Sequence, residues 1–205
     1  MKSNQQGAYH HGNLRQELLA AARRDLREKG KENLSLRALA REIGVSQTAP
    51  YRHFGDKPAL LAALAAQGFT DLTARTRQAL ETAGDDSEAM LIAAGQTYVR
   101  YARDNPELFK LMFGPRPEPQ ETVAELGEAR DQAFANISMI MQRGIEQQVF
   151  EQDDPARLAR AAWAMVHGLA TLIIDHFQTC WEADELDQQI ADSLHIFARG
   201  VRRVK

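Results

Sequence analysis

Apolar residues recur at spacings of three and four along almost all of this chain of 205 residues. That spacing marks one face of an α-helix, and we find no convincing run with the period-two alternation of a half-buried strand. The first clear stripe consists of Leu14, Leu18, Ala22 and Leu26, and Gly30 follows it. The pattern therefore predicts an all-α fold.

The boundaries of the other helices follow from capping residues and helix breakers. Asp85 and Glu88 have the spacing of a capping box, and Asp154-Pro155 suits the start of a helix. The segment Gly114-Pro115-Arg116-Pro117-Glu118-Pro119 is predicted to be a loop. The predicted helices after the first cover residues 35–43, 47–54, 56–82, 85–103, 105–113, 121–149, 155–180 and 184–203.

Composition narrows the class of protein. The chain is 44% hydrophobic and 26% charged, which is ordinary for a globular protein. Cys180 is its one cysteine, so an intrachain disulfide framework is excluded. No apolar run approaches the roughly 18 residues that span a membrane, and no apolar signal core opens the chain. We expect a cytoplasmic protein without a membrane segment.

Charge is distributed unevenly along the chain. Residues 1–57 carry 11 Lys and Arg against 6 Asp and Glu, whereas residues 58–205 carry 14 against 22. A basic head followed by an acidic body suits a polyanion-binding domain joined to a second module, although many surface helices are locally basic. This division predicts two domains, 1–57 and 58–205.

The predicted helix 155–180 is apolar on two sides. The core of a small protein buries one apolar side of a helix, so a second apolar side must pack against something else. This packing partner is either a twin subunit, which makes the chain a homodimer, or the rest of the same chain, if this is the central helix of a monomer. The two stripes are Leu158, Ala162, Met165, Leu169 and Leu172, and Trp163, Val166, Ala170, Ile173 and Phe177.

Residues 35–54 contain the most informative pattern. Two short amphipathic helices are joined by Gly44-Val45-Ser46, in which Gly permits a sharp turn and Ser caps the second helix. This is a helix-turn-helix arrangement, whose second helix enters the major groove of DNA. Most helix-Gly-helix segments bind nothing, but this one is rich in hydrogen-bond donors. The donors are Gln47, Thr48, Tyr51, Arg52 and His53, and the surrounding phosphate-binding candidates are Arg37, Arg41 and Lys57.

The segment LSLRALAREIGVSQTAPYRHFGDKPALLAA resembles the DNA-binding segment of the TetR family of bacterial transcriptional regulators. The family pattern appears as Tyr51, Phe54, Lys57 and Leu60-Leu61. The C-terminal half resembles a subgroup marked by Trp-x-x-x-His-Gly, present here as Trp163, His167 and Gly168.

The resemblance implies an architecture and an activity. It implies a three-helix DNA-binding head and a larger helical body that holds a ligand and forms a homodimer through the last two helices. The expected partner is double-stranded DNA with a palindromic operator. Members of the family usually repress transcription, and a small molecule bound in the body usually releases them.

The resemblance also implies roles for single residues. Gln47 and Thr48 stand where the family reads bases, and Gln suits the edge of adenine. Tyr51 and His53 stand where the family touches phosphate, and Lys57 matches its phosphate-binding lysine. Arg37 is expected to meet the DNA backbone or a base.

Three positions in the head keep an alternative interpretation. Tyr51 is either a phosphate contact or a half-buried ring that packs the small domain, and for Phe54 the packing role is favoured. Pro50 departs from the aliphatic residue that is usual in the family, which puts the local helix geometry in question. The arm Tyr9-His10-His11-Gly12 suits either the minor groove or a disordered tail.

The body has candidates for an effector site. Aromatic residues and methionines line apolar cavities, while Trp163 and His167 offer polar contacts. Each candidate has a core-packing alternative, and His167 also suits a bond to a backbone carbonyl. Because no basic residue is in the set, the expected effector is apolar and neutral or cationic. The candidates are Phe109, Met112, Phe113, Phe134, Ile137, Met141, Trp163 and His167.

No metal-ligand spacing, phosphate-binding loop or nucleophile motif is present in the sequence. We expect neither a cofactor nor a catalytic site. Two alternatives to a ligand-released repressor remain: a DNA-bound protein that recruits a protein partner without a small ligand, and a helical scaffold or enzyme with no role on DNA.

Overall fold

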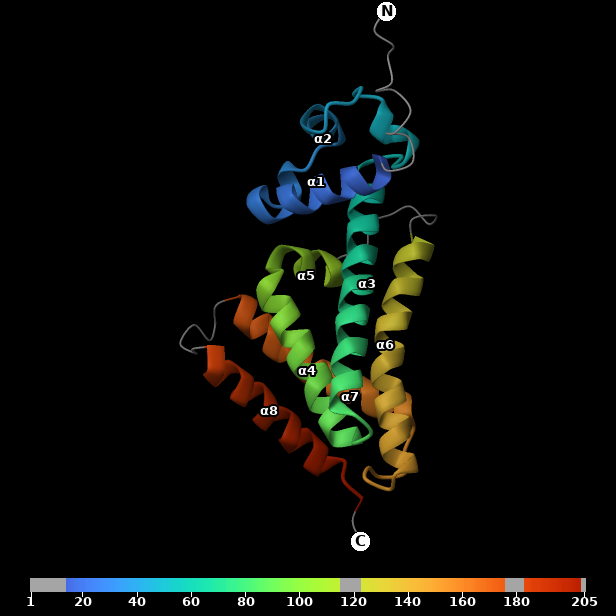
Figure 1. Ribbon diagram of the computed structural model, residues 1–205, viewed down its shortest axis with the longest axis vertical. Coiled ribbons are helices and arrows are strands. Elements are labelled where there is room, and N and C mark those ends of the chain that lie inside the picture. The colour runs from blue at the N-terminus through green and yellow to red at the C-terminus, as the bar shows by residue number, and fades with distance from the viewer. Residues whose placement is uncertain (1–13, 115–122, 176–182, 204–205) are drawn as a thin grey trace, which may run out of the picture. The chain divides into compact units, whose positions relative to one another are not determined.

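The computed structural model describes residues 14–114, 123–175 and 183–203 (Figure 1). These residues form an all-α fold, as the apolar periodicity predicts, and the β-type pairing within them is one isolated bridge between Phe150 and Arg202. The predicted arm, residues 9–12, lies outside the described residues, as do Phe177, Cys180 and the predicted loop from Pro115 onward.

The chain divides into two compact units, each containing segments that are distant in the sequence. Unit 1 comprises Met1–Gly68 with Glu107–Gly127, and unit 2 comprises Phe69–Pro106 with Glu128–Lys205. Two long helices, α3 (Lys57–Ala83) and α6 (Val123–Glu146), each contribute residues to both units.

Unit 1 holds the predicted head. Its core includes the predicted stripe of α1, since Leu14, Leu18, Ala22 and Leu26 are all buried. Helix α5 packs closely on α3, because a Cβ added at Gly68 would lie 2.6 Å from Sδ of Met112. The elements are α1 (Leu14–Lys29), η1 (Lys31–Asn33), α2 (Leu36–Glu42), η2 (Ala49–Arg52), the start of α3, and most of α5 (Pro106–Phe113).

Unit 2 is built around α4 (Ser87–Asp104), which packs against both α7 (Pro155–Ile174) and α8 (Ala183–Gly200). The approach of α4 to α8 is close at Gly95, where an added Cβ would collide with the buried side chain of Leu194. On one edge of this contact, the Arg100 guanidinium binds both carboxylate oxygens of Asp187, at 2.8 and 2.7 Å.

Helix α7 begins as predicted, since the Asp154 side chain accepts a hydrogen bond from the Ala156 amide at 2.9 Å and Pro155 opens the helix. The residues buried within the protomer include Ala162, Val166 and Ala170. These residues come from both predicted stripes, and the first stripe ends in Leu172, which is exposed. One of the two apolar sides of α7 is thus covered only in part by the described residues of the protomer.

Candidate nucleic-acid interface and effector site

The turn after α2 bends at Gly44 as predicted, but the predicted cap at Ser46 is wrong, since η2 begins after Thr48 and has no side-chain cap hydrogen bond. Gly44 adopts a φ of 74°, in the left-handed region that favours glycine. The Val45 amide donates to the Ala40 carbonyl at 2.9 Å, and the Gly44 amide donates to the Arg41 carbonyl at 3.3 Å. These two bonds form a Schellman cap, which satisfies the last carbonyls of α2 and redirects the chain.

The helix predicted over residues 47–54 is shorter in the structure. Only Ala49–Arg52 is helical, as the 3-10 helix η2. Pro50 is the physical cause, because it has no amide hydrogen to donate to the carbonyl of Ser46. That carbonyl instead accepts from the Ala49 amide at 3.0 Å, a bond that spans three residues rather than four.

The side chains predicted to contact DNA are presented on the outside of this segment. The carbon ring of Pro50 and the ring of Phe54 are buried, and α2 packs against η2. The packing role favoured for Phe54 therefore fits its burial, and Tyr51 is exposed rather than packed. The exposed candidates are Arg37, Gln47, Thr48, Tyr51, Arg52 and His53, together with Arg41.

Lys57, the predicted phosphate contact at the start of α3, is partly buried and already has an internal partner. Its ammonium donates to the Glu32 carbonyl at 2.8 Å. An ammonium has three hydrogens, so this bond leaves donors for a phosphate oxygen. The bond links the Lys57 side chain to η1 in the protein without DNA.

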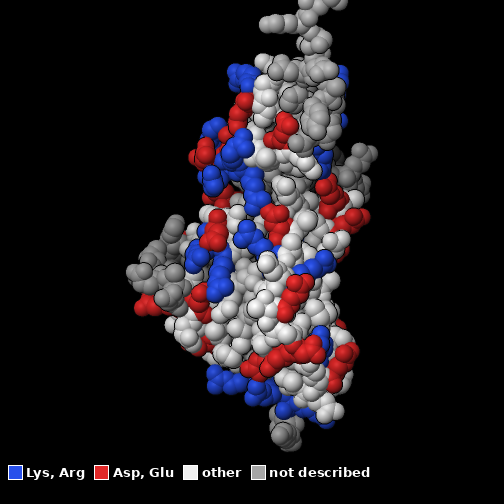
Figure 2. All heavy atoms as spheres, in the orientation of Figure 1, with Lys and Arg blue, Asp and Glu red and all other residues white. Residues whose placement is uncertain are grey.

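Two contacts anchor the end of this segment within unit 1. The Arg15 guanidinium lies over the Phe54 ring, 5.5 Å from its centroid, and binds both carboxylate oxygens of Glu125 at 3.0 and 2.9 Å. On the face shown in Figure 2, Lys and Arg are interspersed with Asp and Glu among the coloured residues, so no face of a single sign is seen in this view.

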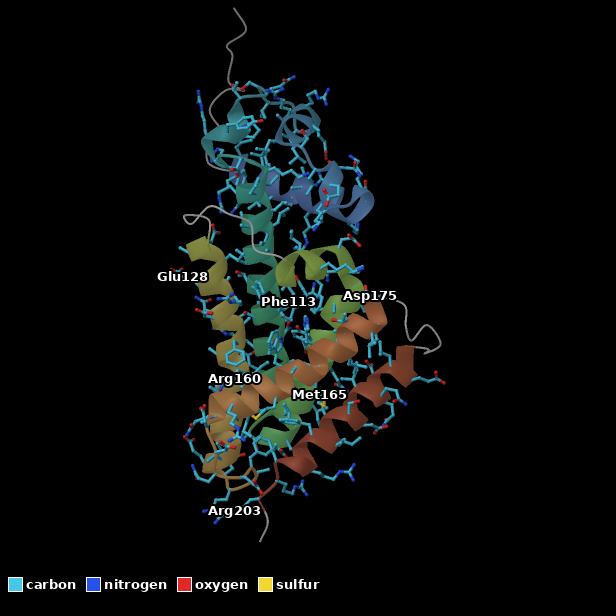
Figure 3. All side chains as sticks on the ribbon, turned by 180° about the vertical axis from the view of Figure 1, so that it is seen from behind. Phe113, Glu128, Arg160, Met165, Asp175 and Arg203 are labelled. Atoms are coloured by element: carbon cyan, nitrogen blue, oxygen red, sulfur yellow. The ribbon has the colours of Figure 1, made fainter. Side chains whose placement is uncertain are left out.

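The predicted effector residues fall into two groups. Phe109, Met112 and Phe113 are in unit 1, where the rings of Phe109 and Phe113 have centroids 4.7 Å apart. Phe113 ends α5, as Figure 3 shows. The other five candidates belong to unit 2: Phe134, Ile137 and Met141 on α6, and Trp163 and His167 on α7. The role of these candidates in binding an effector stays a prediction.

Trp163 and His167 meet at a residue that no sequence motif singles out. Nε1 of Trp163 donates to the Tyr98 hydroxyl at 3.1 Å, and the same hydroxyl lies 2.8 Å from Nδ1 of His167. Tyr98 belongs to α4 and is buried. Because these pairs are 65 and 69 residues apart in sequence, no local spacing signals them.

Burial sets the protonation of this cluster. It lowers the pKa of His167, because the imidazolium loses hydration there. It raises the pKa of Tyr98, against a smaller lowering by the Trp163 hydrogen bond. Both groups are therefore neutral near pH 7. We infer that Tyr98 donates its hydroxyl proton to Nδ1 of His167, which leaves the imidazole proton on Nε2.

The described residues were also compared with the requirements of a metal site and of a membrane-spanning helix. No group of three or more His, Cys, Asp or Glu side chains among them is arranged to hold a metal ion. None of the described helices has both the length and the apolar character that crossing a bilayer requires.

Comparison with known proteins identifies both halves of the chain. Residues 18–64 match the family model for bacterial regulatory proteins of the tetR family. Residues 91–194, half of the chain, match the model for a tetracyclin repressor-like C-terminal domain. The first match contains α2, the turn at Gly44 and η2, and the second contains Tyr98, Trp163 and His167.

Individual relatives agree with the family models. A solved protein of unknown function from Rhodococcus sp. RHA1 is 36% identical, with a TM-score of 0.85, and the alignment covers 96% of this chain and 100% of that one. The HTH-type transcriptional regulator Mb1846 of Mycobacterium bovis is 31% identical over 98 residues, 47% of this chain and 42% of the relative. Nucleoid occlusion factor SlmA of Pasteurella multocida is 30% identical over 119 residues, 54% of this chain and 57% of the relative.

The chain thus spans only about half of the length of the curated relatives that it matches. The two family models, in contrast, together match the head and most of the body of this chain. On that evidence, the chain belongs to the tetR family of bacterial regulatory proteins.

Proposed function

We propose that this protein is a homodimeric transcriptional repressor that binds a palindromic operator and is released by a small apolar effector in its C-terminal body. The observation that carries the proposal is the arrangement of residues 44–54. A left-handed glycine ends α2, two apolar side chains anchor the next segment, and donors occupy its exposed side. Such donors read base edges and phosphates in the major groove.

Within this proposal, Gln47 and Thr48 contact bases and Arg37 contacts the DNA backbone or a base. Tyr51, Arg52, His53 and Lys57 contact phosphates. The 3-10 geometry of η2 reduces the surface that can contact the major groove of DNA, because a 3-10 turn exposes fewer residues to the groove than a full helix does. We expect the base contacts to come from the residues just before Pro50, which are exposed.

The first test is selection of genomic fragments by the purified protein, followed by affinity measurements on the best fragment and on scrambled DNA across a salt series. We expect a palindrome bound at least a thousandfold more tightly than scrambled DNA, which is the lower range for specific binders. Equal affinity for both, falling steeply with salt, would mean that the head holds only phosphate.

A pair of double variants assigns the binding to the head. Arg37→Ala with Gln47→Ala is expected to abolish discrimination between operator and scrambled DNA while the protein stays folded. The matched control is Arg77→Ala with Gln78→Ala, which removes an exposed Arg and Gln from α3 in unit 2. If both double variants weaken operator binding equally, the head assignment is wrong.

One alternative has support of its own. The similarity to a nucleoid occlusion factor favours a DNA-bound protein of this fold that recruits a protein partner and needs no small ligand. The two functions differ in one measurement. A repressor loses operator affinity when its effector is added, whereas a recruiting protein keeps its affinity throughout an effector screen.

A further inference from the structure

Two buried side chains of unit 2 each carry a polar atom that has no hydrogen-bond partner among the described residues. They are Oγ1 of Thr73 on α3 and Nδ2 of Asn136 on α6. Thr73 is 5% exposed and Asn136 is 8% exposed. A buried polar group without a partner is energetically unfavourable, so such groups are rare unless something else binds them.

Each residue occupies a position that the helical period assigns to the core. On α6, Asn136 lies one turn before Ile140 and one period after Ala129, both of which are buried. On α3, Thr73 follows buried Phe69 by one turn and precedes buried Thr76. Asn136 is the one polar residue among the described buried residues of α6. Apolar residues at these two positions would fill the core without leaving a buried polar atom that lacks a hydrogen-bond partner.

The two helices are neighbours. In Figures 1 and 3, the lower stretches of α3 and α6, which belong to unit 2, run beside each other in the same direction. Thr73 and Asn136 both lie within these stretches, away from the C-terminal ends of their helices. A third unpartnered atom, Oγ of Ser87, is in the first turn of α4 beside Gln147, and we do not assign it to the same site.

We propose that Thr73 and Asn136 are the polar anchors of the effector site and that the effector is a neutral, largely apolar molecule with a carbonyl or similar hydrogen-bond acceptor. This rests on the proposed function and narrows its ligand class. The amide nitrogen of Asn136 only donates, so it requires an acceptor. The Thr73 hydroxyl either donates or accepts, so it serves the same oxygen or a neighbouring hydroxyl.

The buried residues of unit 2 favour an uncharged ligand. Among the described residues of unit 2, no Asp, Glu, Lys, Arg or His side chain is buried. A buried ion without a counter-charge is strongly disfavoured. Of the neutral and cationic effectors that the sequence left open, the proposed one is neutral. Asn136 lies between Phe134 and Ile137, so the anchor belongs to the same helix as three of the predicted apolar contacts.

The test uses probe pairs that differ at one group: acetophenone with ethylbenzene, and cyclohexanone with cyclohexane. Each is titrated by calorimetry into the wild-type protein and into Asn136→Leu and Thr73→Val, which keep the shape and remove the polar atom. We expect the wild-type protein to bind each ketone about three- to tenfold more tightly than its hydrocarbon, and each variant to lose this preference. The double variant is expected to lose no more than one single variant, because both atoms serve one ligand.

Thermal unfolding without any probe supplies an independent readout. Removing an unpartnered buried atom is expected to raise the unfolding midpoint by about 2–12 °C in a chain of this length. The matched controls are Gln132→Leu on the exposed side of α6, and Thr82→Val on α3, whose hydroxyl already donates to the Gln78 carbonyl at 3.2 Å. Neither control is expected to raise the midpoint.

Two results would overturn the inference. A midpoint that stays unchanged or falls in Asn136→Leu and Thr73→Val would mean that both atoms already have partners, such as a buried water. Wild-type protein that fails to prefer the ketones would mean that the atoms do not take an acceptor ligand. In both cases, operator binding by the wild-type protein is measured alongside. Retained operator binding limits the failure to the effector chemistry, whereas its absence refutes the proposed function itself.

Discussion

The Tyr98 hydroxyl lies 2.8 Å from Nδ1 of His167 and joins α4 to α7 inside unit 2. The same oxygen accepts a hydrogen bond from Trp163 Nε1 at 3.1 Å, so one phenol serves both polar residues of the Trp-x-x-x-His-Gly marker. The four-residue spacing of Trp163 and His167 places them on one side of α7, where their ring centroids are 5.3 Å apart. The Trp-x-x-x-His-Gly marker thus corresponds to a hydrogen-bonded connection between α4 and α7.

Tyr98→Phe is expected to destabilise the protein by about 1–3 kcal/mol, because it leaves the Trp163 donor and the His167 acceptor without this partner. A chain of this length then unfolds at a midpoint lower by roughly 2–12 °C. Urea denaturation measures the free energy, and Tyr51→Phe is the control because Tyr51 is exposed. Equal stability of wild-type protein and Tyr98→Phe would show that the Tyr98 hydroxyl is not bonded as described.

The lowered pKa of His167 predicts a specific pH dependence of stability. The unfolded chain takes up a proton at His167 near pH 6.5, whereas the folded protein does so only at lower pH. Stability is therefore full above about pH 6.5 and falls as the pH decreases toward the pKa of the folded state. In His167→Gln, whose amide oxygen still accepts from Tyr98, this part of the fall is expected to vanish.

Denaturation curves between pH 8 and pH 5 measure this effect as the difference between the wild-type protein and His167→Gln. His195→Gln is the control, since His195 lies on α8 beside Glu88. A wild-type curve that runs parallel to that of His167→Gln over the whole range would refute the neutral, buried state of His167.

Much of the helical frame is predictable from local patterns, because its signals lie within a few residues. Gly44 has the expected left-handed backbone, and Asp154 caps α7 as expected. The cap of α4 is wrong by one position: the Asp86 side chain, not that of Asp85, accepts from the Glu88 and Ala89 amides. Adjacent aspartates are equivalent in sequence, and only the entry angle of the chain selects between them.

The features that were not predicted depend on contacts distant in sequence. Tyr98 looks like an ordinary core residue until α7 brings Trp163 and His167 to it. Thr73 and Asn136 likewise appear as isolated polar residues within apolar stripes. In contrast, the shortening of the predicted helix 47–54 follows from Pro50 itself. Its missing amide hydrogen limits η2 to one short turn.

Gly144→Ala is expected to destabilise the protein by about 1–3 kcal/mol, because an added Cβ would collide with the buried ring of Phe150. Gly127→Ala is a matched control in α6, since nothing lies within 4 Å of its added Cβ. That change is expected to stabilise the helix by up to about 1 kcal/mol. Urea denaturation of both variants measures the contrast, and two equal effects would contradict the close packing at Gly144.

Lys57→Met tests the role of this lysine on DNA. If Lys57 holds a phosphate, its loss reduces the affinity for operator DNA and for scrambled DNA by a similar factor. It also makes the slope of log affinity against log salt shallower by about 0.9. Fluorescence anisotropy across a salt series measures both quantities. Lys31→Met is the control, because Lys31 is exposed and lies outside the segment 35–57. A loss confined to the operator would instead identify Lys57 as a base contact.

The exposed side of α7 and α8 is the expected dimer interface. Figure 3 shows both helices at the front, with Arg160, Met165 and Asp175 marking the course of α7. Leu172 is 41% exposed and Ile196 is 66% exposed. Gly168 is exposed on α7, and nothing lies within 4 Å of an added Cβ there. No described contact within the protomer requires a glycine at this helical position, whereas close approach by a second copy would.

We therefore expect the wild-type protein to sediment as a dimer, and Leu172→Glu combined with Ile196→Glu to sediment as a monomer, because two pairs of buried carboxylates would face each other across the symmetric interface. Since a palindrome is read by two heads, the monomer is also expected to lose operator affinity by more than tenfold while it remains folded. The control is Met139→Glu on α6, which is 42% exposed and thus changes a comparable apolar surface elsewhere. A dimer that persists in the double variant, or that dissociates equally in Met139→Glu, would place the interface on another face of the chain.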